Sequence, residues 1–458
     1  MTLSLRNPAT GAVVAEVETD THASVLEKLA RARAARPAWA AQPLEERLAT
    51  IARFRDRIVE QKSELALTLT RDMGKPITQS RNELAATPAR LEFFLENTSA
   101  VLEDEPVLRD EGGVSEVIRM EPLGVVANVS AWNYPWFVGT NVFVPALLTG
   151  NAVLYKPSEH AVMTGLAIGR LLHEAGVPED VFAVIVGAGD VGAMLVDAPV
   201  DGVFFTGSYR TGRAIAERVA PRMVRLGLEL GGKDPIYVRG DVDVARAAES
   251  LADGAMYNAG QSCCAVERLY VDSAIYDEFV EAFVRAVRGF VVGDPEDERT
   301  YLGPLARAEQ REVLDAQVAD AVARGAEVLC GGKRVEGPGN YYEPTVIVNA
   351  TNAMRIMREE SFGPVIGIAR VPNDERAIEL MNDTEYGLTA GVYTRDRARA
   401  EHLLARLDAG SVYWNCCDRV SPRLPWTGRR HSGIGSTLSK HGIRAFVQPK
   451  AFHLRSGI

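Results

Sequence analysis

The chain has 458 residues, more than a single hydrophobic core usually serves, so two or more domains are expected. Its composition, 47% hydrophobic and 24% charged, is that of a folded globular protein and argues against disorder. A formal net charge of −10 argues against binding to nucleic acids or to anionic membranes, because both require a basic surface.

The amino-terminal part of the chain predicts a hairpin followed by long helices. Residues 7–11, Asn-Pro-Ala-Thr-Gly, form a turn signal between two short β-prone runs. Gly74 and Pro76 are expected to end the second of the helices that follow. These helical patterns cover 21–36, 43–73 and 79–102.

From residue 113 onward, strands and helices alternate. The helix expected at 160–175 has Ser158 as its N-cap, with Gly176 and Pro178 after its end. A second helix is expected at 189–197. The strands of this first series are expected at 114–120, 125–131, 152–155, 181–186 and 203–206.

A second series of helices and strands occupies residues 241–412. Its helices are expected at 243–257, 275–290, 306–325 and 374–381. Its strands are expected at 267–271, 327–330, 344–348, 364–370, 388–393 and 410–414. Such alternation predicts parallel sheets with helices on both faces, hence an α/β protein with two Rossmann-like lobes that join near Glu229.

The five cysteines lie at 263, 264, 330, 416 and 417. The odd count, the adjacent pairs and the lack of Cys/His spacing indicate neither a disulfide framework nor a metal site, and they suit a reducing cytoplasm. The amino terminus has no apolar region typical of a signal peptide. The most apolar stretch, 124–155, is interrupted by asparagines and prolines, so no membrane-spanning helix is expected.

Residues 187–192 read Gly-Ala-Gly-Asp-Val-Gly, after a predicted strand and before a predicted helix. A conventional dinucleotide fingerprint also needs an acidic residue near 207–212, and that stretch has none. The motif alone therefore does not indicate a conventional pyrophosphate site.

Cys263 and Glu229 are the residues that suggest covalent carbonyl chemistry. A thiolate is a strong nucleophile toward a carbonyl carbon, and a carboxylate nearby can activate a water molecule. The alternative is that Cys263 is a small buried apolar residue and that Glu229 pairs with Lys233.

Six motifs occur in an order and at spacings that closely resemble the aldehyde dehydrogenase superfamily over nearly the whole chain. They are Trp132-Asn133-Tyr134-Pro135, Lys156-Pro157-Ser158-Glu159, Phe205-Thr206-Gly207-Ser208, Glu229-Leu230-Gly231-Gly232-Lys233, Gly260-Gln261-Ser262-Cys263 and Glu360-Ser361-Phe362-Gly363-Pro364.

The resemblance implies catalytic roles at matched positions. Cys263 matches the nucleophile that adds to the aldehyde and forms a thiohemiacetal. Asn133 matches the amide that, with the Cys263 backbone N–H, forms the oxyanion hole. Hydride transfer to nicotinamide then leaves a thioester, and Glu229 matches the base that activates water to hydrolyse it.

The resemblance also implies the cofactor site. Lys156 and Glu159 match the pair on the adenosine ribose, Ser208 the hydroxyl on the pyrophosphate at a helix start, and Glu360 the carboxylate on the nicotinamide ribose. The other cofactor residues are expected to be Trp132, Gly187, Gly207, Leu230 and Phe362. NAD is favoured over NADP, because the Glu159 carboxylate would repel a 2′-phosphate.

Substrate recognition is less specified. Tyr134, Tyr257 and Trp426 match positions that line the aldehyde tunnel of relatives, with a core role as the alternative, and Ser262 is added to this predicted pocket. Aromatic walls favour an apolar, aryl or quaternary ammonium aldehyde. Arg419 could instead hold the carboxylate of a semialdehyde, unless it bonds backbone carbonyls or Asp418.

The resemblance divides the chain into a cofactor domain (1–112 and 126–229), a catalytic domain (230–430) and oligomerisation β segments (113–125 and 444–458). In relatives the β-hairpin joins a carboxy-terminal strand of a partner subunit, so a homodimer or homotetramer is expected. The expected function is NAD-dependent oxidation of an aldehyde to its acid. The alternatives are a semialdehyde or betaine-aldehyde-type enzyme and, less favoured, a coenzyme-A-acylating or non-catalytic relative.

Overall fold

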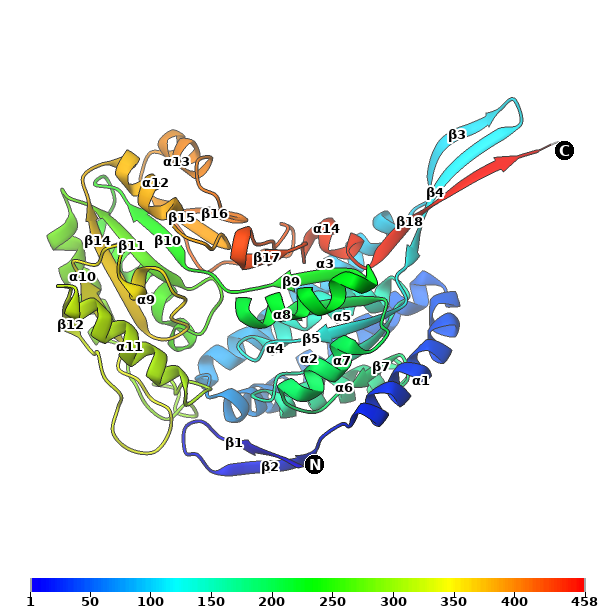
Figure 1. The fold of residues 1–458 in the computed structure, drawn as a ribbon, viewed down its shortest axis with the longest axis horizontal. Coiled ribbons are helices and arrows are strands. Elements are labelled where there is room, and N and C mark those ends of the chain that lie inside the picture. The colour runs from blue at the N-terminus through cyan, green and yellow to red at the C-terminus, as the bar shows by residue number, and fades with distance from the viewer. Residues whose placement is uncertain (1, 457–458) are drawn as a thin grey trace.

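The computed structural model describes residues 2–456, which form two lobes, each with its own sheet (Figure 1). The first lobe contains a six-stranded sheet in the order β17-β9-β8-β5-β6-β7. Its strands are β5 (Val125–Val129), β6 (Ala152–Lys156), β7 (Phe182–Val184), β8 (Gly202–Thr206), β9 (Arg225–Glu229) and the antiparallel edge strand β17 (Gly433–Ile434). All residues of β5 and β6 are buried, as expected for strands covered on both faces.

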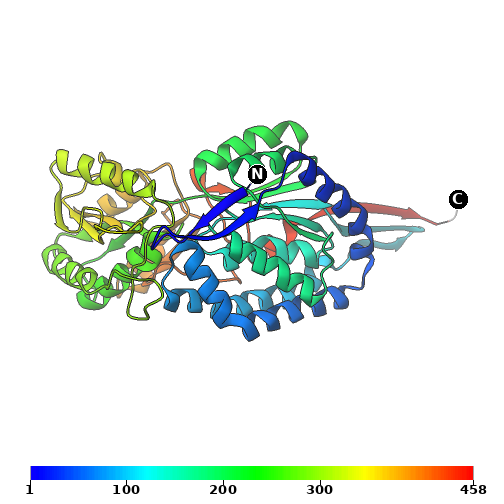
Figure 2. The same cartoon turned by 90° about the horizontal axis from the view of Figure 1, so that it is seen from below.

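Helices cover both faces of this sheet (Figures 1 and 2). They are α1 (His22–Ala41), α2 (Leu44–Met73), α3 (Ile77–Leu102), α4 (Pro135–Val138), α5 (Thr140–Leu148), α6 (Val162–Ala175), α7 (Gly189–Asp197) and α8 (Tyr209–Val219). The expected capping of α6 by Ser158 is wrong, because the helix begins later, after Ala161, and Ser158 accepts instead from the backbone N–H of His160 in the preceding turn. Gly176, in the left-handed conformation, ends α6 as predicted.

The second lobe contains a seven-stranded sheet in the order β12-β13-β14-β11-β10-β15-β16. Its strands are β10 (Asp234–Val238), β11 (Val266–Asp272), β12 (Glu327–Cys330), β13 (Thr345–Val348), β14 (Val365–Val371), β15 (Thr389–Tyr393) and β16 (Ser411–Trp414). All pairings are parallel except that of β12 with β13. The surrounding helices are α9 (Val244–Met256), α10 (Tyr276–Arg288), α11 (Gln310–Ala323), α12 (Asp374–Asn382) and α13 (Arg397–Leu404). The predicted α/β class with two parallel-dominated sheets is confirmed.

A three-stranded antiparallel sheet projects away from the first lobe (Figure 1). It contains β3 (Glu105–Glu111), β4 (Val114–Pro122) and β18 (Val447–Arg455), in the order β18-β4-β3. The expectation that β4 pairs with a strand of a partner is corrected: β18 of the same chain pairs with it, from Val447 opposite Pro122 to Arg455 opposite Val114. Residue 1 and the last two positions of the predicted 444–458 segment lie outside the described residues.

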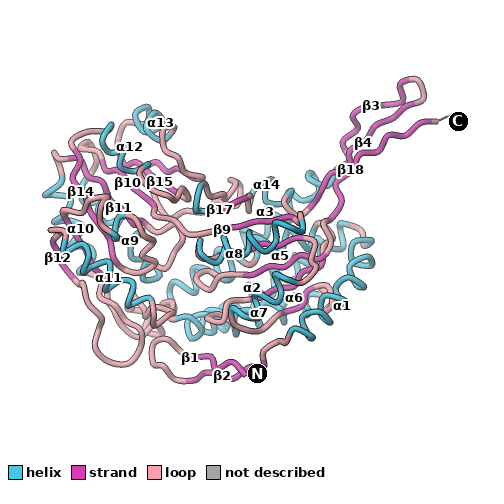
Figure 3. The backbone as a smooth tube through the Cα atoms, viewed as in Figure 1, coloured by secondary structure: helices cyan, strands magenta, loops and turns pink. Residues whose placement is uncertain are grey.

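The remaining elements are short. They are the hairpin β1 (Thr2–Arg6) and β2 (Val13–Glu18), the helix α14 (Ser439–Arg444) and the 3₁₀ turns η1 (Ala220–Arg222), η2 (Tyr257–Gly260), η3 (Arg355–Met357) and η4 (Arg430–Ser432). Between β9 and β10 the chain crosses from one lobe to the other as coil, at residues 230–233 (Figure 3). The predicted site residues gather around this crossing.

Candidate active site

Three separate segments converge around Cys263. This residue follows η2, whereas Asn133 precedes α4 and Glu229 ends β9. The Asn133 side chain donates from Nδ2 to the Gln261 carbonyl at 3.1 Å, which ties the predicted oxyanion donor to the loop that carries the cysteine. A Cβ added at Gly232 would lie 2.8 Å from the Cys263 carbonyl oxygen, so the segment after Glu229 lies against the same loop.

The two adjacent cysteines differ in environment. Cys263 is partly exposed, whereas Cys264 is buried and its Sγ donates to Asp418 Oδ1 at 3.0 Å. A hydrogen bond with Cys263, and then burial, raise the pKa of the Cys264 thiol well above its usual value. Cys264 is therefore held as a neutral thiol, and Cys263 is the cysteine with access to a ligand.

Glu229 does not pair with Lys233, whose ammonium instead contacts Glu267 at 2.6 Å and Ser361 at 2.9 Å. Glu229 Oε1 accepts from Thr437 Oγ1 at 3.1 Å, and Oε2 is buried without a partner. Burial, opposed by the Thr437 hydrogen bonds, raises the pKa of Glu229 to about 8. A carboxyl with a free oxygen and a pKa near neutrality has the properties of a general base.

A buried ion pair that the sequence did not reveal fixes the backbone at Asn133. Lys75 donates to the Asn133 carbonyl at 2.6 Å and pairs with Glu83, and both charged side chains are almost fully buried. Glu83 also accepts from the Trp136 backbone N–H at 3.0 Å. The pair therefore holds both ends of the turn that presents the Asn133 amide.

Replacing Lys75 with methionine should lower the unfolding free energy by about 3–5 kcal/mol, because Glu83 would remain buried without its counter-charge. Denaturation midpoints measure this loss. The double variant Lys75→Met, Glu83→Gln is the control and should recover much of it, since no unpaired charge remains. A single variant as stable as the wild type would contradict the role of the pair.

The residues predicted for the nicotinamide side lie together. The rings of Trp132 and Phe362 meet edge to face at 5.5 Å between centroids. Glu360 Oε1 accepts from the Gly232 N–H at 3.2 Å, and a Cβ at Gly231 would overlap this carboxyl. Burial, and then the charge of Glu267, raise the pKa of Glu360 to about 8.

The residues predicted for the adenosine and phosphate side line the first sheet. The buried Lys156 ammonium lies 3.9 Å from Glu159 Oε2, and Ser208 is the N-cap of α8. The N–H of Gly207 donates to the Glu229 carbonyl at 3.0 Å. Gly187, just before α7, has φ +158°. Leu230 packs closely on α8, because a Cβ added at Gly212 would lie 2.5 Å from the Leu230 side chain.

The predicted substrate residues are brought together only in part. Ser262 Oγ donates to Asp418 Oδ1 at 3.3 Å, and Tyr257 accepts from Asn82 at 3.2 Å. The ammonium of Lys75 lies 3.7 Å from the centre of the Tyr134 ring, so this ring already binds a cation of the protein. Trp426 is buried in the core of the first lobe.

Arg419 is exposed, and its guanidinium donates to the Asp418 carbonyl at 3.3 Å. This is the backbone contact that the sequence left open as the alternative to a substrate contact. Asp234 accepts from the Thr389 hydroxyl at 2.5 Å and from its N–H at 3.1 Å, and so links β10 to β15.

Sequence reasoning missed Lys75, Glu83 and Thr437. Lys75 stands between a helix-ending glycine and a proline, where nothing marks it as buried. No group of three or more potential metal ligands is found among residues 2–456, and within that range no helix is both long and apolar enough to cross a membrane.

Comparisons with known proteins match nearly the whole chain. Residues 1–452 match the model of the aldehyde dehydrogenase family. The succinate-semialdehyde dehydrogenase [NADP(+)] of Deinococcus radiodurans is 36% identical over 445 residues, which cover 97% of this chain and 93% of that protein. The betaine aldehyde dehydrogenase of Mesorhizobium japonicum is 36% identical over 456 residues, 98% and 93% of the two chains. The NAD-dependent aldehyde dehydrogenase of Sinorhizobium meliloti superposes with a TM-score of 0.97 at 34% identity, over 100% and 92%.

Proposed function

The chain belongs to the aldehyde dehydrogenase family and is an oxidoreductase acting on aldehydes; from this premise we propose that Cys263 is its nucleophile, Asn133 its oxyanion donor and Glu229 its hydrolytic base. The observation that carries the proposal is the hydrogen bond from Asn133 to Gln261, which joins the amide to the loop of the partly exposed Cys263.

In the first half-reaction the Cys263 thiolate adds to the aldehyde carbonyl. The developing oxyanion needs donors already in place, because donors that must reorient would lose their advantage. The Asn133 amide meets this need: one N–H is anchored on Gln261, and its turn is held by Lys75. Removing such a donor costs about 10²–10³-fold in kcat.

In the second half-reaction Glu229 takes a proton from water as the water attacks the thioester. Oε2 has no hydrogen-bond partner in the buried site and is the atom we assign to take this proton, and Thr437 fixes the orientation of the carboxyl. Glu229 and Thr437 both line a cavity of about 420 Å³. A base at this position supports hydrolysis over transfer to coenzyme A, which needs no activated water.

The residues present fit a nicotinamide dinucleotide. The N-terminus of the eleven-residue helix α8, capped by Ser208, suits a pyrophosphate, and Glu360 lies against backbone that has no room for a Cβ. A bound nicotinamide would supply the acceptor for the hydride that leaves the thiohemiacetal on Cys263. Lys156 and Glu159 would hold the adenosine ribose. Relatives that use NADP and relatives that use NAD both occur, and the Glu159 carboxylate supports NAD for this chain.

The domain division and assembly complete the proposal. The two sheets and their separate hydrophobic cores support a cofactor domain (1–112, 126–229) and a catalytic domain (230–430). The projecting sheet, with Val107 and Leu454 exposed, supports a homodimer or homotetramer, since so small a sheet is marginal alone. Five cysteines in no disulfide pattern support a cytoplasmic location.

The function is tested by mixing the protein with NAD and a panel of aldehydes, with and without coenzyme A, and following NADH absorbance. We expect NADH to form without coenzyme A. A strict requirement for coenzyme A would favour the acylating alternative, and no reduction with any aldehyde would favour the non-catalytic one.

Replacing Glu159 with glutamine should raise kcat/KM for NADP by about tenfold, because the carboxylate that repels a 2′-phosphate becomes neutral. The value for NAD should fall severalfold, since a neutral amide accepts hydrogen bonds from the ribose less strongly. Initial rates at varied cofactor concentration measure both values. Asp190→Asn, which removes a carboxylate from the first turn of nearby α7, is the control; an equal effect there would contradict the assignment.

A further inference from the structure

Asp418 is a carboxylate beside the reactive cysteine that the proposed reaction does not use. Its Oδ1 accepts from Ser262 Oγ at 3.3 Å and from Cys264 Sγ at 3.0 Å. These two residues flank Cys263 in the chain. The carboxylate therefore lies next to the place where the carbonyl of an aldehyde must arrive.

No cation of the protein forms an ion pair with Asp418 among residues 2–456, and Oδ2 accepts no hydrogen bond within that range. Oδ2 is not fully buried, unlike the interior polar atoms that lack a hydrogen-bond partner, so a ligand can reach it. Burial raises the pKa of Asp418, opposed by the hydrogen bond from Cys264, the charge of Arg419 and the hydrogen bond from Ser262.

The two cations that act electrostatically with Asp418, Lys75 and Arg419, make other contacts. Lys75 is bound to Glu83, to the Asn133 carbonyl and to the face of the Tyr134 ring. The guanidinium of Arg419 is exposed and donates to the main-chain carbonyl of Asp418. Both cations attract Asp418 electrostatically but neither forms an ion pair with it, so the carboxylate keeps the capacity to pair with a cationic ligand and would repel an incoming anion.

Two predicted pocket aromatics lie within electrostatic reach of this charge. Burial, and then the charge of Asp418, raise the pKa of Tyr134. The same two causes, opposed by a hydrogen bond from Asn82, raise the pKa of Tyr257. Lys75 and Phe137 already cover the Tyr134 ring, so of these two rings Tyr257 is the one left beside the carboxylate for an organic cation.

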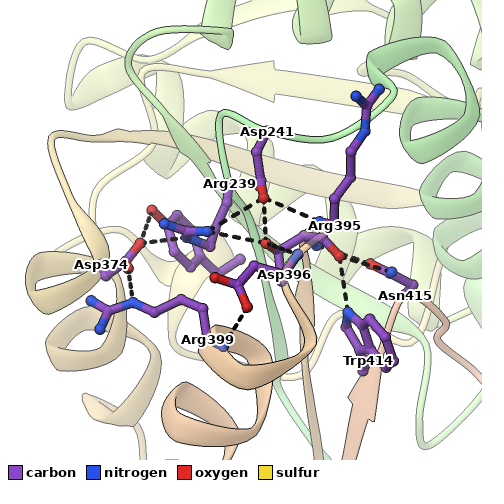
Figure 4. Close-up of polar contacts among 10 residues, drawn as sticks. Arg239, Asp241, Asp374, Arg395, Asp396, Arg399, Trp414 and Asn415 are labelled. Atoms are coloured by element: carbon purple, nitrogen blue, oxygen red, sulfur yellow. Dashed lines mark hydrogen bonds and ion pairs between the residues drawn. The ribbon is translucent and has the colours of Figure 1, made fainter.

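Hydrogen bonds on both sides of the turn hold the loop that carries Asp418. Asn415, with φ +53°, exchanges two hydrogen bonds of 2.9 Å with the backbone of Thr394, and Trp414 donates to the same carbonyl at 2.9 Å (Figure 4). On the other side of the turn, Tyr413 donates to the Arg419 carbonyl at 2.5 Å. Asp418 is thereby fixed in place, as a recognition group must be.

We infer that Asp418 selects aldehydes that carry a positive charge, such as an alkylammonium or trimethylammonium group, over aldehydes that carry a carboxylate. The inference rests on the proposed function and names its substrate class. It favours the betaine-aldehyde-type alternative over the semialdehyde alternative. Sequence identity does not decide between the two, because the chain is 36% identical to a relative of each kind.

The test compares kcat/KM for three aldehydes of similar length: 4-(trimethylammonio)butanal, butanal and 4-oxobutanoate. The wild type should prefer the cation to the anion by at least about tenfold. Asp418→Asn should lower kcat/KM for the cation about tenfold or more, leave butanal within about threefold, and raise the value for the anion. Glu401→Gln, which removes an exposed carboxylate on α13, is the control for net charge and should change none of the ratios.

An unchanged cation-to-anion ratio in Asp418→Asn would overturn the inference, whereas oxidation of none of the three aldehydes by the wild type would overturn the proposed function instead. If Asp418→Asn fails to fold, inhibition of the wild type by charged analogues tests the inference instead. Butyltrimethylammonium should inhibit butanal oxidation competitively and butanoate should not. The reverse order of inhibition would also overturn the inference.

Discussion

Replacing Cys263 with alanine should abolish aldehyde oxidation, lowering kcat by at least about 10⁴-fold, because no covalent adduct can then form. The thiol that remains in this segment, that of Cys264, is buried and donates to Asp418, so it cannot replace the nucleophile. Steady-state NADH formation at high enzyme concentration measures the residual rate. Bound NAD should still protect the variant against thermal unfolding, since the cofactor contacts remain.

Cys264→Ala is the matched control. Cys264 is buried, and its thiol is committed to Asp418. This variant should retain turnover within about an order of magnitude of the wild type, because the thiol that reacts remains. Loss of activity in Cys264→Ala together with retention in Cys263→Ala would reverse the assignment of the nucleophile.

Glu229→Gln should separate the two half-reactions. The glutamine carbonyl can still accept from Thr437, so the local structure is kept, but the amide cannot take a proton from water. The variant should release NADH in one burst of about one equivalent per active site and then turn over at least about 10²-fold more slowly than the wild type. Stopped-flow absorbance measures both phases, and steady turnover at the wild-type rate would contradict the role of Glu229 as the base.

The raised pKa of Glu229 gives this prediction a pH signature. The base acts when ionised, and its pKa is about 8, so hydrolysis in the wild type should rise as pH increases through about 8. The burst in Glu229→Gln should lack this dependence. In the variant, thioester hydrolysis limits steady turnover and proceeds without the Glu229 base. The rate of its slow phase should therefore not follow the pH dependence of wild-type turnover.

Much of the fold could be predicted, because its helices end at recognisable glycines and its apolar residues recur with a regular period. The end of α2 at Gly74 and of α6 at Gly176 follows from glycines that adopt positive φ. Helix α5 could not be predicted in this way, because all nine of its residues are buried and it shows no polar face. The pairing of β18 with β4 joins segments more than 300 residues apart, and no local pattern reports such a contact.

The catalytic residues could be proposed from ordered motifs, but their surroundings could not. The burial of Lys75 and Glu83 depends on how α3 packs against the Asn133 turn, and a charged residue carries no mark of burial in the sequence. Arg419 and Asp418 are neighbours in the chain, yet only the turn at positive φ decides which of them faces Cys264. The sequence offered Arg419 as one alternative beside the aromatic residues, and this turn is the reason that we infer recognition by Asp418 instead.

Mass mapping of the acyl group in Glu229→Gln tests the covalent role of Cys263 most directly. The variant would be mixed with NAD and butanal, quenched in acid after the burst, and digested, and fragment ions would distinguish Cys263 from its neighbour Cys264. A butanoyl mass on Cys263, at about one per chain, is the predicted result. A butanoyl mass on Cys264, or a full burst with no acyl group on either cysteine, would contradict it.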